Sequence, residues 1–322
     1  MRGIITIIAL LVVGIVPLAA QQTPQYTLYM LNKFGINPAY AGLDQSLSVT
    51  GVYREQWVDL PGSPVTQHFN LHLPSYFLGG GLGLEVENER LGAEEHFAAS
   101  LSYANHLILR NRNIISIGVS GGIVQKALDG SLLRTPDGVY EGPTINHNDD
   151  LLPDGRLSAT GATFGAGIYF QGESFETGLS VDHIAESSTA FSLFDYKLRR
   201  TFSYFATYGF DVGRKFRFSP SVLVKSIIEQ TQMDFSALVQ YNDNLFAGVT
   251  FRGYSAPSID ALAIFGGFKI NEKFTVAYGY DITLSSLSDV SRGSHEVLLN
   301  YNLGKPLNKG KLPPIIYNPR FR

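Results

Sequence analysis

Large apolar residues alternate with small or polar residues along most of this chain. Between positions 274 and 282, for example, Phe, Val, Tyr, Tyr and Ile occupy every second position, and Thr, Ala, Gly and Asp stand between them. A period of two is the period of a β-strand, whose successive side chains point to opposite faces. The chain therefore predicts an all-β fold. Fourteen runs of this kind can be counted, at residues 46–58, 64–75, 80–89, 95–110, 113–126, 160–171, 174–185, 199–213, 215–229, 232–242, 244–255, 258–270, 273–284 and 293–303.

The less apolar face of these strands carries few charges. Charged residues make up 16% of the chain, against roughly 25% in ordinary soluble domains. A soluble sandwich would line its wet face with charges, whereas this pattern favours strands with one face to lipid and the other to a crowded lumen. Each run has about 10–16 residues, enough to cross a membrane when tilted. We therefore expect a transmembrane antiparallel outer-membrane β-barrel of about 14 strands over residues 46–303.

The connections between the runs alternate in length. Longer loops, notably 127–159 and 186–198, stand between short polar turns. Outer-membrane barrels have short periplasmic turns and longer outer loops, so we expect that orientation, with the N-terminus in the periplasm. The 127–159 loop is acidic, but its segment 146–150 lacks the acid spacing of a calcium loop, which favours a solvated outer loop of unassigned function. The short turns lie at 110–113, 171–174, 213–215, 242–244 and 271–273.

Two end segments fall outside the strand pattern. Residues 1–20 combine Arg2, an apolar stretch and Ala19-Ala20, which is typical of a signal peptide. We expect its removal and a location in the outer membrane of a Gram-negative bacterium, with residues 21–45 as an N-terminal periplasmic segment. Residues 304–322 carry five basic residues and no acidic one. We expect a basic C-terminal periplasmic tail, either solvated or touching acidic lipid, or docking a periplasmic partner.

The chain offers no recognisable catalytic or metal-binding arrangement. It has no cysteine, which excludes a thiol nucleophile and a Cys-ligated metal. Its net charge of −3 argues against nucleic-acid binding. His68 and His72 lie too far apart along a strand to share a metal easily, and the adjacent Asp182 and His183 point to opposite faces. We expect a protein that is not an enzyme and has no cofactor and no metal.

Three short stretches carry more specific information. They are residues 22–42 with the run Asn-Pro-Ala-Tyr-Ala-Gly, residues 53–66 with the run Arg-Glu-Gln-Trp-Val-Asp-Leu-Pro-Gly-Ser-Pro, and residues 317–321. Together they resemble the PorP/SprF family of Bacteroidetes, outer-membrane proteins of the type IX secretion system and gliding machinery. The candidate family-motif or partner-binding residues are Asn37, Pro38, Tyr40, Gly42, Arg54, Gln56, Trp57, Pro61, Gly62, Pro64, Arg320 and Phe321.

This resemblance implies a function that composition and periodicity do not show. It implies a non-enzymatic component of the type IX secretion system that binds secreted surface proteins and helps to export or anchor them. The implied partners are outer-membrane lipid, the C-terminal domain of a secreted surface protein or adhesin, and periplasmic ring or lipoprotein components. The alternative is an outer-membrane diffusion channel or hydrophobic-substrate transporter, because a barrel of 14 strands has room for a lumen. The sequence leaves open whether that lumen is plugged.

The motif residues also have direct physical interpretations. Pro38 restricts the backbone of Asn37, and Gly42 permits a tight turn. Because Val49 and Gly51 are placed on the lipid side, alternation points Arg54 into the lumen. There a salt bridge that supports folding is favoured over partner contact. Trp57 then lies near the outer interface, where aromatic rings anchor barrels. The charged residues predicted to face inward are Arg54, Glu85, Glu87, Asp211, Lys225, Asp234, Arg252, Asp260 and Asp281.

Overall fold

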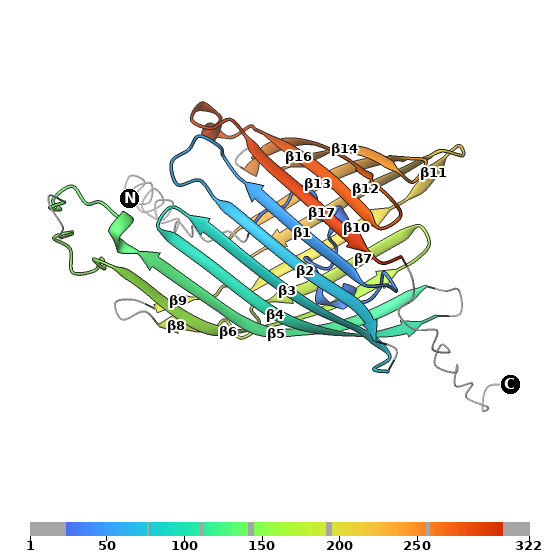
Figure 1. The fold of residues 1–322 in the computed structure, drawn as a ribbon, viewed down its shortest axis with the longest axis horizontal. Coiled ribbons are helices and arrows are strands. Elements are labelled where there is room, and N and C mark those ends of the chain that lie inside the picture. The colour runs from blue at the N-terminus through green and yellow to red at the C-terminus, as the bar shows by residue number, and fades with distance from the viewer. Residues whose placement is uncertain are drawn as a thin grey trace, which may run out of the picture.

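The chain forms an antiparallel sheet that curves round and closes on itself as a β-barrel (Figure 1). The computed structural model describes residues 24–75, 77–109, 113–140, 145–190, 195–255 and 258–304. The short 3-10 helices are η1 (Tyr29–Leu31), η2 (Pro38–Tyr40), η3 (Gly130–Leu132) and η5 (Ser286–Asp289). The strands are β1 (Ser48–Glu55), β2 (Val65–Ser75), β3 (Gly80–Leu91), β4 (Glu94–Ile108), β5 (Ile114–Asp129), β6 (Arg156–Gln171), β7 (Phe175–Asp182), β8 (Ser188–Ala190), β9 (Asp195–Lys197), β10 (Thr201–Tyr208), β11 (Phe210–Val212), β12 (Phe216–Ser226), β13 (Thr231–Tyr241), β14 (Leu245–Arg252), β15 (Ala261–Lys269), β16 (Phe274–Thr283) and β17 (Ser294–Asn302).

Fourteen strands make the wall, because β10 and β11 are two parts of one strand that both pair with β12. Each wall strand pairs with its neighbours in sequence. The first wall strand, β1, pairs with the last, β17, from Ser48 opposite Asn302 to Glu55 opposite His295. This pairing closes the barrel, and the predicted antiparallel barrel of 14 strands is confirmed. The small hairpin of β8 and β9 stands apart from the wall.

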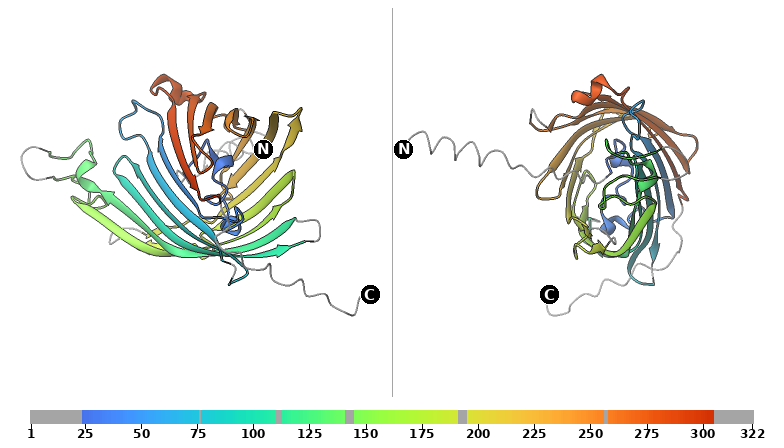
Figure 2. Two further views of the ribbon diagram at one scale, coloured as in Figure 1. Left: turned by 45° about the vertical axis from the view of Figure 1, so that its right-hand side comes forward. Right: turned by 90° about the vertical axis from the view of Figure 1, so that its left-hand side faces the viewer.

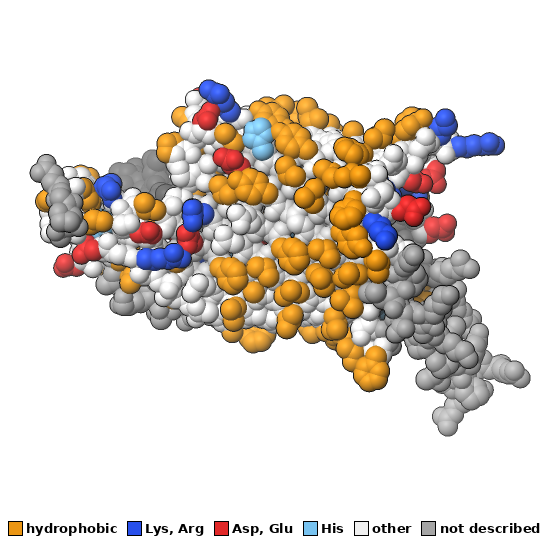
Figure 3. Space-filling model, in the orientation of Figure 1, with side chains coloured by type: hydrophobic (Ala, Val, Ile, Leu, Met, Phe, Trp, Pro, Cys, Tyr) orange, Lys and Arg blue, Asp and Glu red, His pale blue; other side chains and the backbone are white. Residues whose placement is uncertain are grey.

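The period of two in the sequence separates a lipid face from a lumen face. On β1, Thr50 and Arg54 are buried, whereas Tyr53 is 46% exposed. Apolar side chains cover the middle of the outer surface, and charged ones gather towards its two ends (Figure 3). Such an apolar band with polar ends is what contact with bilayer hydrocarbon requires. In the described part of the chain, no helix combines the length and apolar character needed to cross a membrane.

The two ends of the barrel differ, as the connection lengths predicted. At one end, here called the turn end, short turns such as 172–174, 213–215 and 242–244 join the strands. The opposite end, here called the loop end, carries the connections 130–155 and 183–200. β5 and β6 run further than predicted, so the long loop is shorter than the expected 127–159. The second connection contains the β8–β9 hairpin.

Residues 24–46 lie inside the barrel and are here called the plug. Figure 2 shows them in blue within the ring of strands. Leu28 and Phe34 are 1% and 2% exposed, and Tyr40 is 8% exposed. We expected residues 21–45 to form a periplasmic segment; their described part, 24–45, instead lies in the lumen. The physical reason is that these apolar side chains find a shielded environment against inward-facing residues of the wall, with which they share one apolar core.

Candidate functional site

Two buried arginines form an ion network in the loop-end half of the lumen. Arg54 on β1 donates to Asp281 on β16 (Nη2 to Oδ2, 2.7 Å) and to Glu296 on β17 (Nη1 to Oε2, 3.0 Å). Arg252 on β14 donates to the same Asp281 carboxylate at 3.0 Å and to Asp234 on β13 at 3.3 Å. All five side chains are at most 3% exposed. The network therefore links β1, on one side of the β1–β17 seam, to four strands on the other side of it: β13, β14, β16 and β17.

The plug completes this network with its own polar groups. Thr27 donates its backbone N–H to Glu296 at 2.7 Å and its hydroxyl to Asp281 at 2.5 Å. The backbone N–H of Leu28 donates to Glu296 at 3.0 Å. Buried charges are costly unless such hydrogen bonds satisfy them. Plug and ion network thus stabilise each other.

Most of the charges predicted to face inward do lie in the lumen. Arg54, Asp234, Arg252 and Asp281 are among the least exposed side chains of the described chain. Glu296 was missed, although the outward-facing apolar residues at 297 and 299 indicate its side by alternation. Asp211 was expected to face the lumen, but its side chain is 69% exposed and pairs with Arg217. The reason is that β11 ends in solvent at Val212, directly after this residue.

The run Asn37 to Gly42 forms a tight joint between plug and wall. The amide of Asn37 donates to the carbonyls of Ile168 on β6 and Leu179 on β7, at 3.1 and 3.0 Å. Its Oδ1 accepts the N–H of Ala39 at 2.9 Å and so caps η2, which begins at Pro38. These contacts satisfy polar groups that would otherwise be buried without partners.

Aromatic contacts and close backbone approach complete the joint. Tyr40 packs edge-on against Tyr169 of β6, with 5.1 Å between ring centroids. Gly42 has a φ of +78°, and a Cβ on it would lie 2.7 Å from the Cα of Gly81. On β5, a Cβ on Gly118 would lie 2.5 Å from the Cα of Ala39. The glycines are therefore required where plug and wall meet.

Further hydrogen bonds join the plug to other strands of the wall. On β2, the amide of Asn70 donates to Asn32 at 2.8 Å. On β5, the hydroxyl of Ser116 donates to the Ala39 carbonyl at 2.6 Å. On β13, the hydroxyl of Ser236 donates to Tyr29 at 2.9 Å. Together with the contacts above, the plug touches strands on every side of the lumen.

The remaining motif residues that the structure describes lie at the loop end. Gln56 is buried and donates to Gln25 of the plug at 3.4 Å. The backbone N–H of Trp57 donates to the hydroxyl of Ser294 at 3.1 Å. Pro61 and Gly62 are exposed in the β1–β2 loop, and Pro64 is buried where that loop returns to the wall. Arg320 and Phe321 lie outside the described residues. The structure thus brings the motif together in two places, the plug joint and the loop end.

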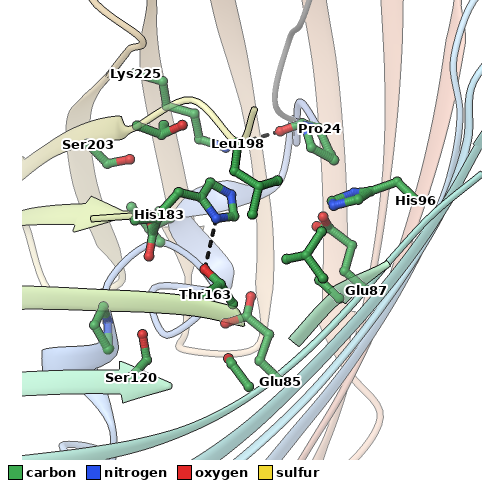
Figure 4. A pocket seen from close by; sticks show the side chains of 18 of the residues that line it. Pro24, Glu85, Glu87, His96, Ser120, Thr163, His183, Leu198, Ser203 and Lys225 are labelled. Carbon is green, nitrogen blue, oxygen red and sulfur yellow. Dashed lines mark hydrogen bonds between the residues drawn. The ribbon is translucent and has the colours of Figure 1, made fainter. Parts of the chain in front are cut away.

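A cavity of about 190 Å³ lies between the plug and the loop end, and we call it the chamber. Figure 4 shows its walls, with Glu85, Glu87, His96, Thr163 and His183 directed towards one space. Sequence reasoning had placed Glu85, Glu87 and Lys225 in the lumen, and all three line the chamber. Its other titratable lining residues are Tyr26, Glu89, His96, Lys126, Asp182, His183 and Arg199.

Two of the chamber carboxylates accept hydrogen bonds from uncharged hydroxyl groups. The phenol of Tyr26 donates to Glu87 at 2.5 Å, and the hydroxyl of Thr66 donates to Glu89 at 3.3 Å. Lys225 donates to the carbonyl of Pro24 at 3.1 Å. Burial lowers the pKa of His183, although the nearby Glu87 opposes this shift. His183 is therefore neutral at pH 7 and adds no positive charge. No group of three or more possible metal ligands occurs among the described residues.

A closed barrel of 14 antiparallel strands, with an apolar outer band and its own N-terminal segment in the lumen, defines a membrane β-barrel of the outer-membrane type. The chain belongs to the family described as type IX secretion system membrane protein PorP/SprF, whose model matches residues 18–301. The resemblance noted in the sequence is thereby confirmed. No curated protein sequence matches the chain.

Two solved structures show the same fold. The CymD monoaromatic hydrocarbon channel is 12% identical, with a TM-score of 0.51, and the match covers 84% of this chain and 92% of that one. The toluene transporter TbuX of Ralstonia pickettii is 11% identical, with a TM-score of 0.51, over 85% of this chain and 92% of that one. At this identity the likeness concerns the barrel alone.

Proposed function

We propose that this barrel is a non-enzymatic component of the type IX secretion system that holds a secreted surface protein at its loop end and helps to export or anchor it. Membership of the PorP/SprF family supports a place in that system. The observation that carries the proposal is the anchored plug. A lumen occupied by the chain's own residues 24–46 suits a protein that binds a partner better than one that conducts solutes.

The proposal includes where the protein lies and how it faces. The outer band and the outer-membrane structural relatives support the outer membrane of a Gram-negative bacterium, with residues 1–20 removed as a signal peptide. The loop end then faces the outside, and the turn end faces the periplasm. In this arrangement the basic segment 304–322 is the docking peptide for periplasmic ring or lipoprotein components, and gliding adhesins are among the secreted partners.

Affinity purification of the full chain from native outer membranes, in mild detergent, tests this function. Mass spectrometry should identify a secreted surface protein and periplasmic secretion components at stoichiometric levels. A matched purification of an unrelated outer-membrane barrel from the same cells controls for adhesion to detergent micelles. Recovery of the barrel alone, under conditions that keep other envelope complexes together, would reject the proposal.

The second candidate, a diffusion channel or hydrophobic-substrate transporter, predicts a different result. The purified chain would then conduct ions in a planar bilayer or accelerate the uptake of an apolar solute into vesicles. The plug argues against this, since its contacts with β1, β5, β6, β13, β16 and β17 fix it in the lumen. Steady conductance of the unmodified chain would favour the channel.

A further inference from the structure

We propose that a hollow on the outer face of the wall holds one acyl chain of a membrane lipid, whose carbonyl linkage accepts hydrogen bonds from side chains of β1, β2 and β3. The hollow lies over β17, β1, β2 and β3, and its volume is about 370 Å³. These strands are consecutive in the wall and face the viewer in Figure 1. The inference goes beyond the proposed function, which concerns the loop end and the plug.

The hollow exists because Gly51 interrupts a row of large outward-facing side chains. The strand register places Gly51 opposite Leu299 on β17 and Phe69 on β2, both of which are exposed. A Cβ on Gly51 would have no atom within 4 Å beyond its chain neighbours, so the backbone of Gly51 forms the floor of the hollow. At about 30 Å³ for a group of the size of water, the volume of about 370 Å³ suits about twelve methylene groups.

The hollow is continuous with the apolar band of the wall. On its turn-end side, β2 and β3 pair Leu71 with Leu84 and Leu73 with Leu82, and alternation turns all four outward with Phe69. This band is the part of the wall that meets bilayer hydrocarbon. An acyl chain therefore already surrounds the hollow, whereas a protein would first have to displace lipid from it.

A row of uncharged polar side chains borders the hollow on its loop-end side. Tyr53, Gln67 and Asn88 stand opposite one another on β1, β2 and β3, and all three line the hollow. They are here called the polar row. All three are exposed, and within the part of the chain that the structure describes none of these side chains has a hydrogen-bond partner. Beside hydrocarbon, such groups are costly unless they find one.

The polar row lies at the depth of the carbonyl linkages of a bilayer. The next layer towards the loop end carries charge, with Glu55 on β1 and Arg90 on β3 on either side of Val65. The row therefore marks the border between hydrocarbon and the headgroup region. The carbonyl at the head of an acyl chain is an uncharged acceptor, which matches uncharged donors. In the orientation proposed above, the lipid belongs to the outer leaflet.

Native mass spectrometry of the full chain in detergent tests the inference with a defined probe. The probe is dimyristoyl phosphatidylcholine, and its control is the diether analogue, which has the same chains and headgroup but no carbonyl. One diester lipid should stay bound to each barrel, about fivefold more tightly than the diether. The double variant Gln67→Leu with Asn88→Leu should bind the diester no more tightly than the diether.

Gly51→Leu tests the hollow itself, because the new side chain would fill the space that the acyl chain needs. Binding of the diester should weaken at least about tenfold. Gly121→Leu is the matched control, since Gly121 also faces outward, between Leu101 on β4 and Phe164 on β6, and does not line the hollow. Heat-modifiable migration on gels establishes that each variant is a folded barrel before it is measured.

Four outcomes would overturn the inference. Equal binding by Gly51→Leu and the unmodified chain would mean that the lipid lies elsewhere. Several lipids that leave together, with no single one retained, would indicate ordinary contact along the whole wall. Equal binding of diester and diether would remove the polar row from the site. A protein that is recovered from native membranes with the unmodified chain, but not with Gly51→Leu, would make the hollow a protein-docking site instead.

Discussion

Arg54 on β1 reaches past the neighbouring strand β17 to bind Asp281 on β16 at 2.7 Å. The same guanidinium binds Glu296 on the strand that it crosses. One side chain therefore links three consecutive strands of the wall on the lumen side. It lies over the seam where the first and last strands of the chain meet, and it donates to the Thr27 hydroxyl of the plug at 3.0 Å.

Replacing Arg54 tests whether this link is structural. Arg54→Ala leaves Asp281 and Glu296 with less compensation in the lumen, and removing one partner of a buried ion pair costs about 3–5 kcal/mol. We expect a lower urea midpoint or less folded barrel in the membrane, measured by heat-modifiable migration. Arg214→Ala, in the exposed turn after β11, is the control. Normal barrel levels with selective loss of the surface partner would instead give Arg54 a role in binding.

Thr27 tests the attachment of the plug itself. Thr27→Val keeps the shape but removes the hydroxyl that donates to Asp281, at a cost of about 1–3 kcal/mol. Thr27→Ser retains the donor and should stay close to the unmodified chain. We expect the valine variant to unfold at lower urea and to show transient conductance steps in planar bilayers as the plug loosens. Identical behaviour of the two variants would show that the hydroxyl does not hold the plug.

Gly118 and Gly121 on β5 form a matched pair for the plug–wall joint. A Cβ at Gly118 would lie 2.5 Å from the Ala39 backbone, whereas the nearest atom to a Cβ at Gly121 is a Phe164 ring carbon at 3.7 Å. Overpacking of this kind costs about 1–3 kcal/mol. Gly118→Ala should therefore lower the thermal midpoint, and Gly121→Ala should not. Equal midpoints would mean that the plug moves away at no cost.

The absence of cysteine from the chain allows the orientation to be tested by labelling. Asp150→Cys places a thiol at the loop end, and Glu272→Cys places one at the turn end, both at exposed positions. In intact cells, a membrane-impermeant maleimide should label the first variant and not the second. Permeabilised cells should label both. The reverse pattern would place the long loops in the periplasm.

Deletion of residues 304–322 tests the basic segment. The last wall strand ends at Asn302, so the barrel should remain folded and keep its heat-modifiable migration. Removing five positive charges should weaken the recovery of periplasmic partners, and more so at low salt, where such attractions are strongest. A deletion that abolishes heat-modifiable migration would refute a docking role in this form, because the segment would then be needed for folding.

The wall was predictable from the sequence because alternation is local. Each strand must turn one face to lipid and the other to the lumen, and residues 274–282 show this without knowledge of any neighbour. The position of the plug was not predictable in the same way. Residues 24–46 have no repeating period, and their burial depends on partners far away in the chain, such as Ser116, Leu179 and Glu296.

The candidate site was predictable only in part, for the same reason. Alternation placed Arg54, Glu87 and Asp281 in the lumen, but it did not show which of them meet. The register of β16, β17 and β1 places Glu296 directly opposite Arg54, and Asp281 lies two residues beyond that level on β16, where the long Arg54 side chain reaches it. The chamber depends further on the plug, since Pro24 and Tyr26 form part of its wall.

The pairing of β1 with β17 also bears on assembly. Glu296 belongs to the last strand to emerge during synthesis, and it binds the backbone of Thr27, near the start of the plug. The strand that closes the barrel and the N-terminal plug therefore share buried hydrogen bonds, so the final register of the seam and the final position of the plug depend on each other. Closing the barrel and filling its lumen are coupled, because the same Glu296 carboxylate binds Arg54 across the seam and the backbone of the plug.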